Sequence, residues 1–551
     1  MATALRVRVL GRVEYREALA LQHALHRRRG EDYLLLLEHP HVYTLGVRAR
    51  REHVLVPPDE LGGELVRADR GGDVTYHGPG QLVGYPIVDV PLGPAAVPSF
   101  VHGVEHLVIE ALRRLGLDDV GRIEGLPGVW VAPASPAARK VCAVGVRVSR
   151  GRSMHGFALN VDPDLSMFER IVPCGLAGRP VTSLAAEGVR ASMADVVDAV
   201  VEAAATSLPA ASTPRRQVER QDCAPARAAE PEVHATGPAR PLERRLARAG
   251  VDSRRALPLG SRKPSYLRVE ARLGPEYLGL RSTLRGLSLT TVCEEAGCPN
   301  IYECWAEGTA TFMINGERCT RACGFCLVDT RRPGPLDPEE PEHVAAAVER
   351  LRLAHAVVTA VARDDLDDGG ATAFAETIAA IRRRCPSTSV EVLIPDCKGR
   401  EEALRTIFDA APDVLNHNLE TVLRLQRAIR PSASYARSLA LLARAKAAGL
   451  TTKSGLILGM GETDAEVLGA LADLASVGVD IVTLGQYLRP SAAHVPVARF
   501  VPPEGFEALA AEARAMGFRH VEASPLTRSS YHARRAAAAV AAAQPAAIRP
   551  A

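Results

Sequence analysis

Six of the eleven cysteines in this 551-residue chain lie in one short segment, and no other feature of the sequence constrains the fold as strongly. They form two triplets: Cys293, Cys298 and Cys304, then Cys319, Cys323 and Cys326. The N-terminal sequence mixes charges with its apolar residues and offers no signal-peptide core, so we expect a cytoplasmic protein, with an organelle still open. In a reducing compartment, clustered thiols indicate a metal centre or catalysis rather than disulfides.

Length and charge narrow the class of protein further. A chain of this length exceeds one ordinary hydrophobic core, which predicts two or more domains. Basic and acidic residues number 67 and 64, a formal net charge of +3, so we expect no nucleic-acid or membrane partner. No apolar run approaches the roughly 20 residues that span a bilayer.

Residues 1–206 mix strand-like and helix-like segments. YLLLLEHPHVYTLG, QLVGYPIVDV and CAVGVRVS are typical of strands, whereas residues 100–116, FVHGVEHLVIEALRRLG, are typical of a helix. In that segment apolar residues recur at steps of three and four: Val101, Val104, Leu107, Val108 and Leu112. The mixture predicts an α/β or α+β domain.

The composition changes twice further along the chain. Residues 207–262 are rich in Ala, Pro and Arg with few large apolar residues, which predicts a mobile linker, although its arginines could also touch an acidic partner. Residues 263–535 alternate buried-strand runs such as VEVLIP and LTTKSGLIL with amphipathic helices such as ATAFAETIAAIRRR. This alternation predicts a parallel sheet in a full or partial (β/α) barrel. Residues 536–551 form an Ala-rich tail that we expect to fray.

The second cysteine triplet has the spacing C-x3-C-x2-C, within ERCTRACGFCLVDT. Three thiolates on one loop can hold a four-iron cluster and leave one iron open, which the amino and carboxylate groups of S-adenosylmethionine (SAM) can chelate. The alternative is a structural zinc site, which closes with four ligands. The first triplet, C-x4-C-x5-C, suits a second cluster better than a pool of six zinc ligands.

The segment TVCEEAGCPNIYECWAEGTATFMINGERCTRACGFC closely resembles the signature of the lipoyl synthases, which are radical SAM enzymes. The resemblance continues through ARDDLDDGG, VEVLIPD, LNHNLETV, TKSGLILGMGET, GQYLRPS and RSSYHA, and covers residues 263–533. It implies two 4Fe–4S clusters, one held by Cys319, Cys323 and Cys326 and one held by Cys293, Cys298, Cys304 and Ser530. Ser529 is the alternative serine.

The same resemblance implies the reaction. In this family SAM cleavage yields a 5′-deoxyadenosyl radical, which removes hydrogen from C6 and C8 of a protein-bound octanoyl chain. Each carbon radical then takes a sulfide from the second, sacrificial cluster. A serine oxygen is a harder and more easily displaced iron ligand than a thiolate, which suits a cluster that must come apart.

Three segments carry the chemistry of the N-terminal half: RGGDVTYHGPGQLVGYP at 70–86, RKVCAVGVR at 139–147 and MHGFALNVDPDLSMFERIVPCG at 154–175. Glycines in the first permit close backbone approach, although a structural loop explains them equally well. A lone Cys174 is more often an inert buried thiol. A lysine such as Lys140, held nearby, would lower its pKa and carry a proton.

Together these segments resemble the lipoyl(octanoyl) transferases, over about residues 5–205. The resemblance implies a biotin/lipoate ligase-like α/β fold, with Cys174 as the nucleophile that forms an octanoyl thioester and Lys140 as its activator. It also implies a substrate cradle: Arg70, Gly71, Gly72, Asp73, Val74, Thr75, Tyr76, His77, Ala143, Val144, Gly145, Gly156, Phe157 and Ala158. ATP-dependent lipoate ligases share this fold and need no thiol, so Cys174 favours the transferase.

The two resemblances predict a bifunctional enzyme of lipoate biosynthesis. Its expected partners are octanoyl-acyl carrier protein, an electron donor, and lipoyl-carrier domains of 2-oxoacid dehydrogenase E2 subunits and of the glycine cleavage H protein. A radical SAM enzyme that inserts sulfur into a small molecule or RNA, a zinc-stabilised binding module, and a chain with one decayed half remain as alternatives.

Overall fold

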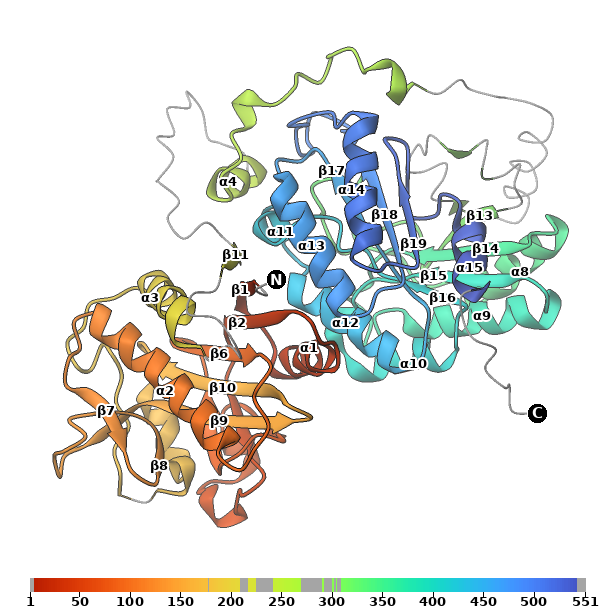
Figure 1. Cartoon of the computed structure of the whole chain (residues 1–551). Coiled ribbons are helices and arrows are strands. Elements are labelled where there is room, and N and C mark those ends of the chain that lie inside the picture. Colours follow the sequence, from red (N-terminus) through yellow and green to blue (C-terminus); the bar gives the residue numbers. More distant parts are fainter. Residues whose placement is uncertain are drawn as a thin grey trace. The chain divides into compact units, whose positions relative to one another are not determined.

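The computed structural model describes residues 4–176, 178–208, 217–223, 241–268, 290–291, 300–301, 304 and 309–542. The chain divides into two compact units, Met1–Arg227 and Ala228–Ala551 (Figure 1). The predicted two-domain α/β organisation is confirmed. None of the described helices combines the length and the apolar content needed to cross a membrane.

An eight-stranded sheet forms the centre of the N-terminal unit. Parallel pairing joins β1 to β2 and β11, and all other neighbours are antiparallel. In spatial order the strands are β11 (Val218–Asp222), β1 (Leu5–Arg12), β2 (Asp32–Glu38), β6 (Gln81–Ile87), β10 (Arg152–Asn160), β9 (Arg139–Ser149), β8 (Leu126–Val131) and β7 (Val120–Ile123). The predicted strand segments are therefore strands, and YLLLLEHPHVYTLG is divided between β2 and β3 (Val42–Leu45).

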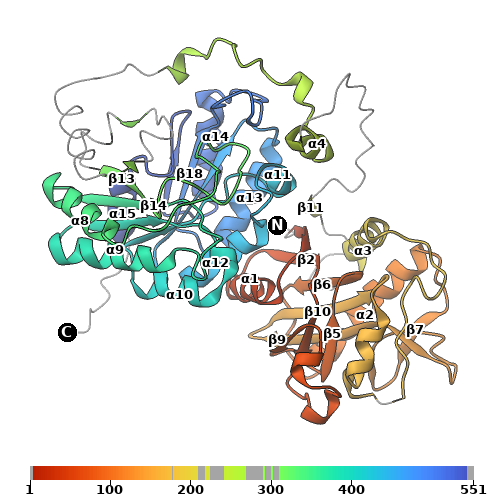
Figure 2. The same ribbon diagram turned by 180° about the vertical axis from the view of Figure 1, so that it is seen from behind.

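Three helices belong to this unit: α1 (Tyr15–Arg27), α2 (Ala96–Arg114) and α3 (Met193–Ser207). The α2 and α3 helices pack on each other and on the sheet (Figure 2). Of the periodic apolar residues of α2, four are fully buried and Val101 is half-buried. Burying one such side chain stabilises the fold by about 1.5–3 kcal/mol, which explains why the period predicted this helix correctly.

A smaller three-stranded sheet carries the functional loops, in the order β4 (Glu64–Arg67), β3 (Val42–Leu45), β5 (Val74–His77). Its core includes the buried rings of Tyr43, Tyr76 and Phe168. Four 3-10 turns surround it: η1 (Arg51–His53), η2 (Pro58–Glu60), η3 (Leu165–Arg170) and η4 (Pro173–Gly175).

The C-terminal unit contains a second eight-stranded sheet in which β13 to β19 are parallel and in sequence order. The strands are β12 (Thr290–Thr291), β13 (Thr309–Ile314), β14 (His355–Ala360), β15 (Ser389–Leu393), β16 (Val414–Asn416), β17 (Thr452–Leu458), β18 (Ile481–Gln486) and β19 (His520–Ala523). Among the described residues β12 and β19 are the two ends of the sheet, so the predicted barrel is a partial one.

Helices alternate with these strands, as the sequence predicts. They are α8 (Glu340–Arg350), α9 (Ala371–Arg384), α10 (Glu401–Asp409), α11 (Leu423–Ile429), α12 (Tyr435–Ala447), α13 (Asp464–Ser476), α14 (Pro503–Ala515) and α15 (Ala533–Ala542). The apolar faces of α8, α9 and α10 share one core with β13 to β16. Because parallel strands all end at one edge, the loops that follow them gather there.

Two parts of the predicted linker at 207–262 are ordered, and there the linker prediction is wrong. Strand β11 pairs with β1, and an edge strand of this kind needs backbone hydrogen bonds rather than a large apolar face. Helix α4 (Pro241–Arg248) buries only Leu246 and contacts α11, where Arg245 Nε donates to Ala428 O at 3.1 Å. Residues 209–216 and 224–240 lie outside the described part.

The Ala-rich tail predicted at 536–551 also begins as ordered structure. Helix α15 packs against β19 and buries Ala533, Ala536 and Val540. Alanine has the highest helix propensity, and its small side chain lets a helix approach a sheet closely, so low complexity did not mean fraying here. Residues 543–551 are outside the described residues.

Candidate functional site

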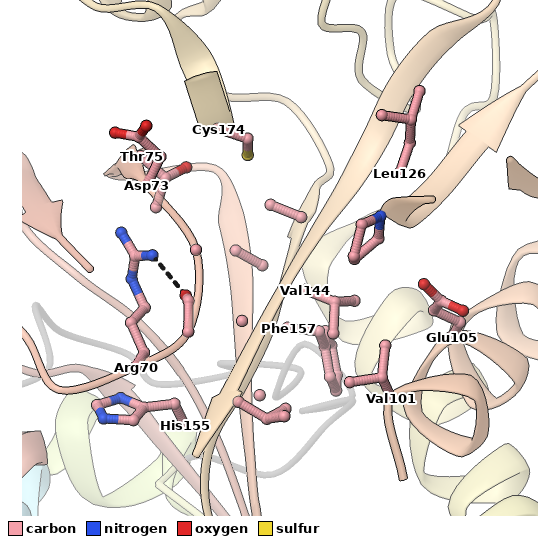
Figure 3. A pocket seen from close by; sticks show the side chains of 18 of the residues that line it. Arg70, Asp73, Thr75, Val101, Glu105, Leu126, Val144, His155, Phe157 and Cys174 are labelled. Atoms are coloured by element: carbon pink, nitrogen blue, oxygen red, sulfur yellow. Dashed lines mark hydrogen bonds between the residues drawn. The ribbon is translucent and has the colours of Figure 1, made fainter. Parts of the chain in front are cut away.

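A cavity of about 820 Å³ lies in the N-terminal unit, between the β5 segment, the paired middle parts of β9 and β10, helix α2 and the η4 turn (Figure 3). Fourteen of the sixteen predicted N-terminal site residues line it: Arg70, Gly71, Gly72, Asp73, Thr75, His77, Lys140, Ala143, Val144, Gly145, Gly156, Phe157, Ala158 and Cys174. Segments far apart in sequence therefore meet around one space.

The other two predicted residues, Val74 and Tyr76, do not line the cavity. Successive side chains of a strand point to opposite faces, so Asp73, Thr75 and His77 face the cavity while Val74 and Tyr76 face the core of the small sheet. The predicted substrate cradle includes both residues because it takes the motif as a continuous stretch, whereas the strand alternates its side chains between two faces.

Cys174 lies in the η4 turn with φ 56° and ψ 19°, the left-handed region that non-glycine residues rarely adopt. Its thiol is partly exposed, and in Figure 3 the side chain points into the cavity. A hydrogen bond of 2.8 Å from Val172 N to His53 O fixes the approach to this turn. The fold therefore holds a thiol in a strained turn at the cavity wall, which fits a nucleophile better than an inert core cysteine.

Lys140 is buried in β9. Its Nζ donates to Pro127 O at 3.0 Å and lies 4.7 Å from the centre of the Trp130 ring. The backbone of Lys140 is paired with the chain that follows the η4 turn, through bonds of 2.9 Å to Pro180 O and from Thr182 N. The side-chain nitrogen of Lys140 thus has a fixed place on the cavity that Cys174 also lines.

Arg70 is a buried cation beside the same cavity. Its guanidinium donates to neutral oxygens only among the described residues, those of Thr44 and Gly71. Burial lowers the pKa of Arg70, while the neighbouring Tyr15 and Cys174 side chains act in the opposite direction. A buried guanidinium without a carboxylate partner is suited to bind a substrate oxygen or to stabilise developing negative charge on it.

Two glycines of the cradle have a packing role. A Cβ on Gly156 would lie 2.1 Å from Gly84 O, and one on Gly145 would lie 3.0 Å from Gly71 O. The sequence suggested that such glycines admit a ligand. In the structure they admit neighbouring backbones, and this close packing shapes the cavity wall.

The sequence reasoning missed an ion pair next to the thiol. His53 Nδ1 lies 2.7 Å from Asp73 Oδ2, and both residues line the cavity. A Cβ on Gly175 would lie 2.8 Å from that carboxylate oxygen, so the pair packs directly against the Cys174 turn. His53 belongs to a loop 20 residues away from Asp73, and no spacing in the sequence signals the contact.

One side of the cavity carries apolar side chains, of which the sequence reasoning missed two. Val144 of β9 and Phe157 of β10 belong to the predicted cradle, whereas Val101 of α2 and Leu126 of β8 do not. Figure 3 places all four on the opposite side from Arg70, with Glu105 beside them. Val101 and Leu126 occur as ordinary core residues in the sequence. An apolar wall beside a polar end suits an acyl chain with a reactive carbonyl.

In the C-terminal unit, Cys319, Cys323 and Cys326 lie on the loop that follows β13. Cys319 Sγ accepts hydrogen bonds from the backbone nitrogens of Arg321 at 3.4 Å and Ala362 at 3.3 Å. Burial, together with the neighbouring Cys323 and Cys319, raises the pKa of the Cys326 thiol to about 11. Three soft sulfur donors that interact with one another and receive backbone N–H groups fit an iron–sulfur cluster.

Ion pairs fix this loop to the edge of the sheet. Arg321 donates to both oxygens of Asp364 at 2.8 Å, and to Asp396 Oδ1 at 2.5 Å. Asp364 and Asp396 follow β14 and β15, so the loops after three neighbouring strands are joined at the carboxyl edge. Although burial opposes the shift, Arg321 lowers the pKa of Asp396 to about 2.

The first triplet is only partly within the described residues, since Cys293 and Cys298 lie outside them. Cys304 is buried and its nitrogen bonds to Asn300 O at 3.0 Å, while Asn300 Nδ2 donates to Leu526 O at 2.7 Å. That bond brings the Cys304 segment next to the turn with Ser529 and Ser530, which are both half-buried.

No three His, Cys, Asp or Glu side chains of the described part converge closely enough to hold a single metal ion. A four-iron cluster places its thiolates on different iron atoms, so its ligands do not converge on one point.

Comparisons with known proteins divide the chain in the same way. Residues 14–205 match the family model of the lipoyl protein ligase A/B catalytic domain. Residues 241–298 match the N-terminal domain of lipoyl synthase of the radical SAM family, and residues 313–474 match the radical SAM superfamily. The lipoyl synthase match thus begins within the stretch that we predicted as a linker.

Individual relatives agree with the lipoyl synthase match. The lipoyl synthase of Kineococcus radiotolerans is 53% identical over 295 residues, which are 54% of this chain and 88% of that protein. The lipoyl synthase of Mycobacterium avium is 56% identical over 274 residues, 50% of this chain and 89% of that protein. Lipoate-protein ligase A bound with ATP, a solved structure, aligns over 40% of this chain and 88% of its own at 19% identity, with a TM-score of 0.34 that is too low to bear on the fold.

Proposed function

Because the chain belongs to the lipoyl synthase family and also carries a lipoyl protein ligase A/B catalytic domain, we propose that it carries out two consecutive steps of lipoate biosynthesis on one carrier protein. The first step attaches an octanoyl group and the second inserts two sulfurs into it. The observation that carries the first step is that Cys174, Lys140 and Arg70 line one cavity.

In the first step the Cys174 thiolate attacks the thioester carbonyl of octanoyl-acyl carrier protein. A new S–C bond forms, the bond to the carrier's arm breaks, and the arm leaves as a thiol. Arg70 is placed to stabilise negative charge on the carbonyl oxygen, and Lys140 to take the proton of Cys174 and return it to the leaving thiol. The apolar side of the cavity accommodates the acyl chain.

In the second half of this step the amine of a carrier lysine attacks the Cys174 thioester. The C–N bond forms, the C–S bond breaks, and the proton lost by the amine passes to the released sulfur of Cys174. We propose lipoyl-carrier domains as acceptors, such as those of 2-oxoacid dehydrogenases and the glycine cleavage H protein.

The alternative for the N-terminal unit is an ATP-dependent ligase, which the matched family model also covers. Cys174 in its strained, partly exposed turn favours the transferase, since adenylate chemistry has no use for that thiol. Octanoyl transfer without ATP supports the transferase. A strict ATP requirement, together with full activity of Cys174→Ser, would establish the ligase.

In the C-terminal unit, Cys319, Cys323 and Cys326 would hold the cluster that binds SAM, and Cys293, Cys298, Cys304 and Ser530 would hold the second cluster. When bound, the first cluster supplies the electron that cleaves SAM and the second supplies the sulfur atoms. Arg321 keeps the loop with Cys319, Cys323 and Cys326 in place. The hydrogen bond from Asn300 to Leu526 keeps the Cys304 segment beside the Ser530 turn. A separate protein must donate the electrons.

Fusion of the two units raises the effective concentration of the shared intermediate, because one tethered chain presents both sites to the same carrier. At low enzyme concentration we expect the fusion to lipoylate a carrier faster than equimolar separate halves. Equal rates would remove this advantage. We also propose a cytoplasmic location, where the clustered thiols would stay reduced.

The decisive test of the second step begins with anaerobic reconstitution of the full chain with iron and sulfide. An octanoylated lipoyl-domain peptide is then incubated with SAM and a reductant and weighed by mass spectrometry. Replacement of two hydrogens by two sulfurs, with release of 5′-deoxyadenosine, would support the proposal. SAM cleavage without sulfur gain would indicate a radical SAM enzyme with another substrate, and zinc in place of iron would indicate a binding module.

A further inference from the structure

Three exposed arginines lie at the mouth of the N-terminal cavity: Arg48, Arg50 and Arg51. Arg48 and Arg50 line the cavity together with Cys174, and Arg51 begins the η1 turn next to them. Their guanidinium groups form no ion pair within the part of the chain that the structure describes. The rim of the cavity is therefore a cationic surface.

The backbone of this segment is fixed against the RGGD motif. Val47 N donates to Arg70 O at 3.0 Å and Arg48 N donates to Gly72 O at 3.1 Å. Arg50 N is 3.4 Å from Asp73 Oδ1. The arginines thus extend from a well-supported loop rather than from a free one.

The same loop is tied to the turn that carries the thiol. Leu55 N donates to Arg170 O at 2.9 Å, and Val172 N donates to His53 O at 2.8 Å, so the segments before Cys174 and after Arg51 run side by side. A partner held by the arginines would therefore be held at a fixed position relative to Cys174.

We propose that Arg48, Arg50 and Arg51 are the docking surface for the acyl donor and bind the acidic face of its carrier protein. This inference rests on the proposed function and names where the donor binds. The octanoyl thioester is at the end of a flexible arm that enters the cavity, so the body of the carrier stays outside, against the rim. Exposed charges of one sign raise the rate of encounter with an oppositely charged partner, at little desolvation cost. Val47, which is 68% exposed, offers an apolar contact beside the three arginines.

The test compares three octanoyl thioesters as donors to the full chain: octanoyl-acyl carrier protein, octanoyl-coenzyme A, which has phosphates but no protein, and octanoyl-pantetheine, which has neither. The readout is the rate of octanoyl-Cys174 formation, followed by intact-protein mass spectrometry. The variant is Arg48→Glu/Arg51→Glu. The matched control is Arg190→Glu, an exposed arginine of the same unit that does not line the cavity.

In the double variant we expect the rate with octanoyl-acyl carrier protein to fall by about tenfold or more relative to the rate with octanoyl-pantetheine. High salt should slow the wild type towards the variant, because it screens exposed charges. Arg190→Glu should leave both rates unchanged.

Three outcomes would overturn this inference. An equal change for all three donors would mean that the arginines act in the cavity itself. A loss as large with octanoyl-coenzyme A as with the carrier would assign them to the arm's phosphate. A loss confined to transfer from octanoyl-Cys174 to the lipoyl domain would assign the surface to the acceptor. Failure of wild-type Cys174 to acquire an octanoyl group from any donor would instead reject the proposed function.

Discussion

The two candidate sites of this chain are built in opposite ways. In the N-terminal unit the reactive groups belong to the protein: a thiol in a strained turn, a buried lysine and a buried arginine surround a preformed cavity. In the C-terminal unit the residues form a candidate cofactor-binding loop: three thiols on a segment that Arg321 fixes to the edge of a parallel sheet. We propose that the first site performs chemistry with its own side chains and that the second positions a cofactor that performs it.

The strongest test of this contrast is Cys174→Ser. Serine keeps the shape but is a far weaker nucleophile, so we expect octanoyl transfer to fall by about 10³-fold or more. Sulfur insertion into a peptide that is already octanoylated should not change. Acyl transfer from octanoyl-acyl carrier protein and sulfur insertion are measured separately on the same preparation. Retained transfer would mean that the N-terminal site does not use its own thiol.

The second prediction concerns the cluster ligand proposed in the C-terminal unit. Because its role is to hold the cluster, Ser530→Ala should retain SAM cleavage while sulfur insertion falls by about 10–100-fold. The release of 5′-deoxyadenosine and the mass of the peptide are measured in the same reaction. Ser529→Ala is the matched control and should keep both activities. The reverse pattern would move the ligand to Ser529.

Third, Arg321→Met removes the partner of Asp396, a carboxylate with a side-chain exposure of 0%. An unpaired buried charge costs about 3–5 kcal/mol, and we expect the lower end because Arg437 lies 3.7 Å from the other oxygen. Urea denaturation gives the loss of stability, and the iron content after reconstitution should fall with it. Arg383→Met breaks an exposed pair with Glu342 and should cost less than about 0.5 kcal/mol.

The last prediction concerns the difference in acid sensitivity between the two units. Burial lowers the pKa of His39 to about 4 and that of His77 well below its usual value, both in the N-terminal unit. Each stays neutral when folded but binds a proton near pH 6.5 when unfolded. The stability they contribute is therefore complete above pH 6.5, and the part due to His39 declines by up to about 3 kcal/mol as the pH falls towards 4.

Among the described residues of the C-terminal unit, burial lowers the pKa of one histidine in this way, that of His417 to about 4. Asp396 of that unit behaves differently, because its pKa is lowered from 3.8 to about 2 and its contribution is lost only below pH 4. Segment-resolved hydrogen exchange, corrected for its intrinsic pH dependence, should show the N-terminal unit losing more stability between pH 6.5 and 4. His39→Gln should reduce that difference. Parallel loss in both units would contradict the prediction.

Much of the fold was predictable because it follows from periodicity. ATAFAETIAAIRRR coincides with α9, and VEVLIP overlaps β15, since buried strands and amphipathic helices carry their pattern locally. The failures occurred where burial is slight. Strand β11 and helix α4 bury few apolar side chains, and helix α15 is rich in alanine, so composition alone pointed to a linker and a fraying tail.

The sequence by itself determined the residue types of both sites: Cys174 and Lys140 in their motifs, and the spacing of Cys319, Cys323 and Cys326. Such motifs are local, because a loop or a turn needs particular residues at fixed steps along the chain. Only the tertiary structure decided which side chains meet. It turned Val74 and Tyr76 away from the cavity, placed His53 against Asp73, and joined Arg321 to two carboxylates from other loops, because strand alternation and loop packing bring together residues that no sequence spacing relates.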